Sequence, residues 1–188
     1  MTRILSILFT MLTLGACGLT DDNVLYLLEP SSSQMRVTTS VRSIEVMEVD
    51  LPDYANAPEI LVKGAGGQLV GDNSNLWADI PSRAIAAAIG RNLSEITSIT
   101  TATEPWPLEE FPDMRLEVRV DQMIADLSSG FRLTGQYFLT PLGSNFRDQA
   151  VRFSITEPIE GQGPSAYSRA ASRAILTLSE QMATQLSN

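Results

Sequence analysis

Apolar and polar side chains alternate with a period of two along three segments in the second half of the chain. Residues 114–121 place methionine, leucine and valine on one face and arginine, glutamate and aspartate on the other. Residues 131–139 and 151–156 alternate in the same way, and short connections at 128–130 and 141–145 separate the three segments. This pattern predicts an antiparallel meander with one face in the core and the other in water.

Two further segments repeat their apolar side chains at helical spacing. Residues 81–96 begin with a proline, which suits the first turn of a helix, and one face carries Ile85, Ile89, Leu93 and Ile96. Residues 165–186 carry a longer stripe, formed by Tyr167, Ala171, Ala174, Leu178, Met182 and Leu186. Two amphipathic helices and a sheet with one apolar face predict an α+β fold: a two-layer sandwich with a largely antiparallel sheet and both helices on one face.

The first half of the chain predicts shorter strands. Residues 24–28 are apolar on both faces, which is typical of an interior strand. Residues 41–49 are rich in β-branched side chains and favour another strand. The apolar segments 60–62 and 69–70 flank the glycine cluster at 64–67, and this order predicts a hairpin with a glycine turn.

The N-terminus has the pattern of an export signal. After the single positive charge of Arg3, residues 4–12 form a mainly apolar run that is too short for the roughly 20 residues that span a bilayer. Small residues then lead into Cys17, the only cysteine. This arrangement resembles a bacterial lipobox, in which the signal is cut before a cysteine that is acylated. The alternative is an ordinary secretory signal with a chance cysteine.

These patterns divide the chain into a signal peptide at 1–16, an acylated tether at 17–23 and one domain at 24–188. The 172 residues of the mature chain are enough for one hydrophobic core. Residues 18–23 reach at most ~20 Å when extended, so the domain is expected close to the membrane that holds the acyl chains. No later apolar run is long enough to span a bilayer.

Charge and residue usage exclude several function classes. The signal contains one of the 13 basic residues and none of the 22 acidic ones, so its removal shifts the net charge from −9 to −10. This charge argues against nucleic acid as a partner and against a polybasic grip on anionic lipids. The absence of histidine removes the usual general base and the commonest metal ligand. We expect no cofactor, no metal and no intramolecular disulfide.

The motifs that would indicate an enzyme are incomplete. The glycines at 64–67 would need a further glycine at the position of Leu69 to match G-x-G-x-x-G, and no G-K-[ST] follows. Residues 72–75 lack the glycine and the closing glutamate of a calcium loop. The sequence therefore predicts a protein that is not an enzyme. A carboxylate pair within residues 109–113 stays open, because the separation of two carboxylates is a structural quantity.

Three aromatic side chains in predicted loops are candidates for contact with a partner protein. Tyr54, Trp77 and Trp106 lie where the ends of the sandwich are expected, and tryptophan and tyrosine are enriched at interface hot spots. Trp77 is alternatively a core residue at one end of the sandwich. The outward face of the predicted sheet carries mixed charges that are either solvated or paired across strands.

A set of short motifs in a fixed order resembles a known family. Residues 51–54 (LPDY) and 57–62 (APEILV), followed by Leu69, are similar to its L-P-x-Y, P-x-I-V-x-R and L positions. Residues 77–79 (WAD) and 92–93 (NL) are similar to its helix segment. The family is that of the ABC-type transport auxiliary lipoproteins, which includes the lipoprotein of the paraquat-inducible (Pqi) system. The resemblance covers essentially the whole mature chain and departs from the family pattern at 63–64 and 80–81.

The resemblance implies an accessory lipoprotein that works beside an ABC transporter and a mammalian-cell-entry (MCE) domain protein. Such systems move lipids or other hydrophobic molecules across the Gram-negative envelope. Gly18 after the cysteine is similar to the outer-membrane sorting pattern, which implies an outer-membrane lipoprotein that faces the periplasm, with the inner membrane as the alternative. Two other functions stay open: a structural envelope lipoprotein, and a lipid carrier with a cavity of several hundred Å³. Homo-oligomerisation also stays open.

Overall fold

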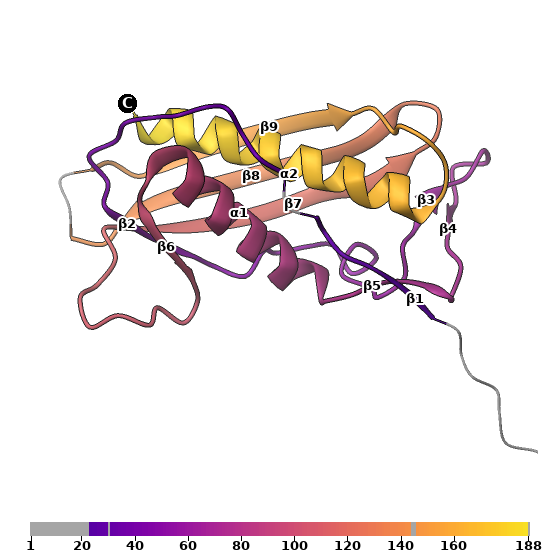
Figure 1. Ribbon diagram of the computed structural model, residues 1–188, viewed down its shortest axis with the longest axis horizontal. Helices are drawn as coiled ribbons and strands as arrows, with labels where there is room; N and C mark the ends of the chain where they lie inside the picture. The colour runs from indigo at the N-terminus through magenta and orange to yellow at the C-terminus, as the bar shows by residue number, and fades with distance from the viewer. Residues whose placement is uncertain (1–22, 30, 144–145, 188) are drawn as a thin grey trace, which may run out of the picture.

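The computed structural model describes residues 23–29, 31–143 and 146–187. Figure 1 shows its two layers, a twisted sheet and a pair of helices that lie across it. The signal and lipobox predictions, including Cys17, lie outside the described residues.

Three long strands form the antiparallel meander that the alternation predicts. They are β7 (Met114–Asp126), β8 (Gly130–Pro141) and β9 (Gln149–Glu157), and β8 pairs antiparallel with both neighbours. The other edge of β7 pairs in parallel with β2 (Ser43–Val46) at its start and with β3 (Val62–Lys63) at its end. A further strand, β6 (Thr100–Thr103), pairs in parallel with β2. The seven-stranded sheet is therefore mixed, with its longest pairings antiparallel.

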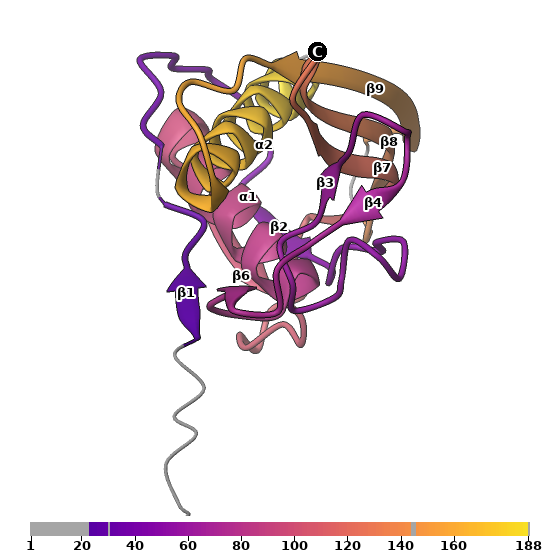
Figure 2. The ribbon, with the colours of Figure 1, turned by 90° about the vertical axis from the view of Figure 1, so that its right-hand side faces the viewer.

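Two helices cover one face of this sheet. They are α1 (Pro81–Thr97) and α2 (Pro164–Leu186), and each carries a proline in its first turn. Figure 2 looks at the end of the molecule and shows both helices on the same side of the long strands. The two helices also contact each other, and a buried hydrogen bond of 3.2 Å runs from the Asn92 amide to the Ser179 hydroxyl. The predicted α+β sandwich is confirmed.

The core lies between the helices and the apolar face of the meander. The predicted alternation holds there, because Leu116 and Val118 of β7 are fully buried and so are Leu133 and Leu139 of β8. The helix stripes meet them with further fully buried side chains, among them Ile85, Ile89, Leu93, Ile96 and Leu178. The space between the layers is thus filled with large side chains.

The prediction of an interior strand at 24–28 is wrong. The strand β1 (Val24–Tyr26) belongs to a separate two-stranded parallel sheet with β5 (Asn75–Trp77). Val24 and Leu25 are exposed, at 49% and 60%. An apolar segment this short is not buried by its composition alone, because burial requires a second layer over it. The predicted glycine-turn hairpin is confirmed, with β3 paired antiparallel to β4 (Leu69–Val70).

The long strands give the molecule two ends. The described chain starts at one of them, the tether end, which is formed by β1, β3, β4, β5 and the turn between β7 and β8 (Figure 1). The distal loop, residues 104–113 between β6 and β7, lies at the other end. The 13 residues of β7 bridge the two ends, which at about 3.3 Å per residue places them roughly 40 Å apart. Within the described residues, neither helix has the length and apolar character needed to cross a membrane.

Candidate functional site

The distal loop is fixed to the sheet where it starts and where it ends. The Glu104 amide donates a hydrogen bond of 3.0 Å to the carbonyl oxygen of Val46. At the other side, the Asp113 amide donates to the Ser43 hydroxyl at 3.0 Å, and the Asp113 carboxylate accepts hydrogen bonds from the Arg42 amide at 2.8 Å and the Arg42 guanidinium at 3.1 Å. Partial burial raises the pKa of Asp113, but the hydrogen bonds and the charge of Arg42 outweigh it, and the pKa is lowered overall.

Trp106 ties the middle of the loop to a buried carboxylate. Its backbone amide donates to Glu45 at 3.1 Å, and its indole N–H donates to the Glu110 carbonyl oxygen at 2.7 Å. The second oxygen of Glu45 accepts a hydrogen bond of 2.9 Å from Arg115, and Glu45 is 6% exposed. Because both oxygens of this buried carboxylate are satisfied, the contact stabilises one loop conformation. The Trp106 side chain thus organises the loop from within.

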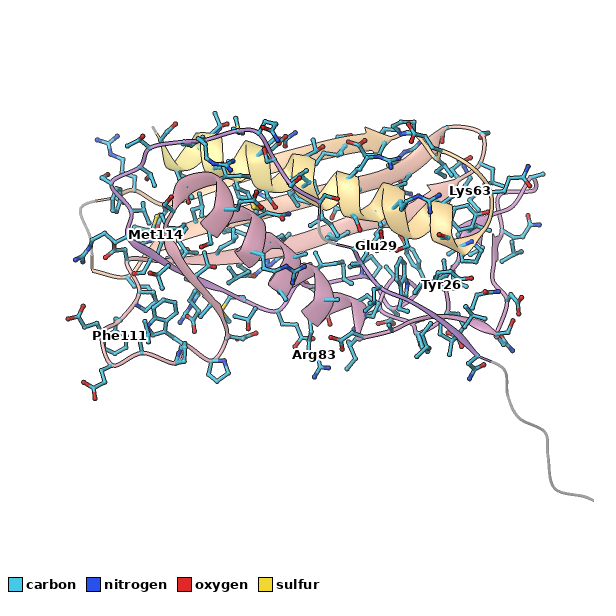
Figure 3. All side chains as sticks on the ribbon, in the orientation of Figure 1. Tyr26, Glu29, Lys63, Arg83, Phe111 and Met114 are labelled. Carbon is cyan, nitrogen blue, oxygen red and sulfur yellow. The ribbon has the colours of Figure 1, made fainter. Side chains whose placement is uncertain are left out.

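The fixed loop presents apolar side chains to solvent. Phe111 is 86% exposed, the highest value among the exposed large hydrophobic residues, and Leu108 is 54% exposed. Figure 3 shows Phe111 on the part of the loop that projects away from both layers. An aromatic side chain held in water on an ordered loop keeps its full hydrophobic surface available for a partner, and such side chains act as anchors in protein interfaces.

Carboxylates flank the exposed phenylalanine. Glu109 and Glu110 are both exposed and directly precede Phe111. The third carboxylate of this segment, that of Asp113, is engaged with Arg42. Among the described residues, no group of three or more potential ligands could hold a metal ion.

The two other predicted aromatic anchors lie elsewhere. The Tyr54 hydroxyl accepts a hydrogen bond of 3.2 Å from the Met123 amide, and its ring packs against the core. Trp77 pairs with Tyr26 in the small sheet and also packs against the core, beside a cleft of about 160 Å³ at the tether end. Tyr54 and Trp77 are half-buried. The structure therefore does not bring Trp77 and Trp106 together, and partner contact by these three residues stays a prediction.

On the charged outward face of the sheet, some oppositely charged side chains lie close to each other. Arg119 donates to Glu117 at 2.6 Å, and its guanidinium lies 5.1 Å from the centre of the Phe138 ring. Arg152 lies 4.0 Å from Asp121. Both pairs are exposed to solvent, so each contributes little to stability.

A wide cleft opens beside the end of α2. Its volume is about 770 Å³, and its walls come from residues 38–41, 146–149 and 185–187 together with Met114. Val41, Phe146 and Leu186 contribute apolar surface, but serine, threonine and glutamine side chains alternate with them. The cleft is therefore of mixed polarity and lies outside the filled space between the layers.

Sequence reasoning identified Trp106 in the distal loop but missed Phe111. The available signal was a large aromatic residue between two glutamates and Pro112, in a segment whose prolines prevent a helix. Such a residue has no regular element to carry it into the core. Phe111 is exposed because the loop projects from the sheet, and this cannot be deduced from the residue type.

The comparisons with known proteins agree with the fold. A family model described as "ABC-type transport auxiliary lipoprotein component" matches residues 26–183. The crystal structure of an uncharacterised protein is 19% identical, with a TM-score of 0.71, and the match covers 87% of this chain and 97% of that one. A protein from Xanthomonas campestris, from a family of unknown function, is 16% identical, with a TM-score of 0.65, over 85% of this chain and 92% of that one. A search of the curated proteins finds no match.

Proposed function

This chain belongs to the ABC-type transport auxiliary lipoprotein family, and from that premise we propose that it acts as a non-enzymatic adaptor held at a membrane by its N-terminus. Family membership makes it an auxiliary component of a transport system, located with the membranes of the cell envelope. The domain contacts other proteins of the system through its distal loop, and it performs no chemistry on the cargo.

One observation carries this proposal: Phe111 is 86% exposed on a loop that hydrogen bonds fix from both sides. Docking such a side chain buries apolar surface and requires little ordering of the loop, because the loop is ordered in the unbound domain. The two glutamates beside it favour a partner with lysine or arginine around an apolar pocket. Charge pairs of this kind at the rim raise the association rate and set the orientation.

The partner in this proposal is the MCE-domain protein or the ABC transporter of the same system, and the cargo is a lipid or another hydrophobic molecule. Both follow from the resemblance of the motifs at 51–62 and 77–93 to the Pqi-type lipoproteins. The anchor is an acylated Cys17, and Gly18 after it supports an outer-membrane location that faces the periplasm. Two or more acyl chains give a stable anchor, whereas one gives only reversible binding.

The test is quantitative co-isolation of the MCE-domain protein with variants of this chain after crosslinking in native membranes. Phe111→Ala is compared with Leu127→Ala, which removes an exposed apolar side chain at the opposite end of the molecule. We expect Phe111→Ala to reduce the recovered partner by about 30-fold, as for an interface hot spot of ~2 kcal/mol, and Leu127→Ala to leave it unchanged. Both substitutions are at the surface, so both variants should keep the melting temperature of the parent protein.

Equal recovery with Phe111→Ala and the parent protein would contradict docking through the distal loop. Recovery of this chain without any transporter or MCE protein would instead support a structural envelope lipoprotein. The mass of the isolated assembly also reports whether the chain forms a homo-oligomer.

A lipid carrier is the second candidate, and the cleft of about 770 Å³ favours it. The volume lies in the range of ligand pockets, but the mixed polarity of the walls is less suited to an acyl chain than an apolar lining. Native mass spectrometry of the full chain in mild detergent separates the two functions. One non-covalent lipid per chain supports the carrier, whereas a mass explained by the covalent acyl chains alone supports the adaptor.

A further inference from the structure

Exposed apolar side chains gather at the tether end. Ten large hydrophobic residues in the described part of the chain are exposed, and six of them come from elements at this end: Val24, Leu25, Leu27, Leu69, Val70 and Leu127. Leu27 and Leu127 are 66% and 65% exposed, and Leu25 is 60% exposed. These six side chains are concentrated at one end of an elongated domain.

Strand pairing makes these elements neighbours in space. The strand β1 pairs with β5, and the amide of Ile60 just before β3 donates to the Asn75 carbonyl oxygen of β5 at 3.1 Å. The strand β3 pairs with β4 on one side and with the end of β7 on the other, where Lys63 lies opposite Asp126. The β7–β8 turn follows directly. Figure 2, which faces this end, shows β3 and β4 side by side, with β1 on the opposite side of the view.

The charges beside these apolar residues are paired locally. The Lys63 ammonium donates to the Asp126 carboxylate at 2.9 Å, and the other oxygen of Asp126 accepts a hydrogen bond from the Ser128 amide at 2.9 Å. Asp72 likewise accepts hydrogen bonds from Ser74 and Asn75. These two carboxylates therefore do not require a charged partner.

We propose that the tether end rests on the membrane that anchors the chain, with its exposed apolar side chains in the headgroup region. This inference rests on the proposed acylation of Cys17. Six residues separate Cys17 from Val24, and they span at most ~20 Å, so the end from which the chain emerges cannot lie far from the bilayer. The long strands then point away from the membrane and hold the distal loop roughly 40 Å above it.

A lipid surface suits this end better than a second protein. The acyl chains keep the domain next to the bilayer at high effective concentration, so a few shallow apolar contacts are enough to fix its orientation. The net charge of the mature chain, −10, gives no attraction to anionic headgroups. The contact is therefore apolar, and it should persist on zwitterionic lipid and at high salt.

The test uses the full acylated chain in vesicles of phosphatidylethanolamine with a minor fraction of phosphatidylglycerol. The chain has no cysteine besides Cys17, so Leu25→Cys, Leu127→Cys and Phe111→Cys each provide a single thiol for a nitroxide label. Electron paramagnetic resonance then measures collision of the label with oxygen, which enriches in lipid, and with a water-soluble nickel complex. We expect several-fold less collision with nickel at positions 25 and 127 than at 111, with or without added salt.

Equal collision with nickel at all three positions would overturn the inference, because the domain would then hang free of the surface. Protection at 111 alone would also overturn it, with the distal loop on the membrane. Flotation of the vesicles separates this result from the anchor itself: protein that does not float has no acyl anchor, and then both the anchor and the inference fail. A further label at Leu27→Cys should also be protected from collision with nickel. In a Leu25→Glu and Leu127→Glu double variant the protein should still float with the vesicles, but this label should lose its protection from nickel.

Discussion

At the scale of single residues, Tyr137 places a polar group in the core without a hydrogen-bond partner in the described part of the chain. Tyr137 is fully buried, and its hydroxyl has no hydrogen-bond partner among the described residues. Burial raises the pKa of this hydroxyl to about 12, so it stays neutral in the physiological range. Its ring stacks on Phe153 with a centroid distance of 6.4 Å. The aromatic ring therefore contributes to the core, whereas the hydroxyl opposes folding.

Tyr137→Phe should raise the free energy of unfolding by about 1 kcal/mol, because it removes an unsatisfied buried hydroxyl and keeps the ring. Urea denaturation followed by circular dichroism measures the difference. A loss of stability would mean that the hydroxyl has a partner in solution, such as a bound water, and would contradict this explanation.

Asp113 makes the fixation of the distal loop depend on pH. Its folded-state pKa is lowered, so its contribution to stability is present above the unfolded-state value of about 3.9 and is lost as the pH falls through the folded-state value. Asp113→Asn should therefore be less stable than the parent protein at pH 7, and the difference should shrink in acid. Urea midpoints between pH 7 and pH 3 test this, with the exposed Asp53→Asn as control. A difference that stays constant with pH would contradict it.

At the residue scale, sequence reasoning identified Trp106 as a candidate for partner contact and missed the exposed Phe111. The lack of histidine and the incomplete motifs follow directly from the sequence. Trp106 was named because tryptophan is enriched at interface hot spots, but its indole N–H donates to the loop itself and Phe111 faces the solvent. Which of two nearby aromatic side chains is exposed depends on how the loop folds back, and residue type does not reveal it.

At the scale of elements, hydrophobic periodicity predicted the long helices and strands. Both helices and the three strands of the meander have apolar faces that repeat over many residues. All five were predicted at the right place in the chain, although β7 continues five residues past the predicted 114–121. The strand β6 was missed because its four residues, three of them threonine, show no alternation. The parallel pairings of β2 and β3 with β7 join segments far apart in sequence, so no local pattern could predict them.

The long hairpin also contains a feature that only the structure reveals. Gly135 of β8 lies opposite Val120, next to a register shift in β7. A Cβ at this position would stand 2.9 Å from both the Phe153 ring and the Val120 Cα, and closer still to the Arg119 carbonyl oxygen. The strands therefore approach each other at a point where only glycine fits.

Gly135→Ala should destabilise the domain by about 2 kcal/mol or more, because backbone atoms would have to move. Gly90→Ala is the matched control in α1, where the nearest atom to an added Cβ is 3.5 Å away. This second change should raise stability by roughly 0.5–1 kcal/mol, because alanine favours a helix over glycine. Thermal unfolding of both variants measures the two effects, and equal melting temperatures would contradict the close approach at Gly135.

At the scale of the whole molecule, the domain is elongated along its long strands. Its tether end and its distal loop are separated by the length of β7, and the filled core between them leaves the surface to carry the function. The chain belongs to a family described as an auxiliary lipoprotein component of ABC-type transport. In the proposed function, the tether end is held at the membrane and the distal loop contacts the partner.

Cys17→Ala should release a folded domain from the membrane, because the acyl chains are the proposed anchor. Detergent phase partitioning gives the readout, with circular dichroism as the control for folding. The parent protein should enter the detergent phase and the variant the aqueous phase. A folded variant that still enters the detergent phase would place the anchor elsewhere in the chain.

The central claim, that the distal loop docks a protein of the transport system, is tested most directly by photo-crosslinking in living cells. A photoreactive amino acid replaces Phe111 in one strain, and Leu127 or Arg152 in two control strains. We predict a discrete adduct from position 111 whose second component is the MCE-domain protein or the transporter, with none from the controls. An adduct from position 152 on the outward sheet face, with none from 111, would contradict the claim and move the docking surface to the sheet.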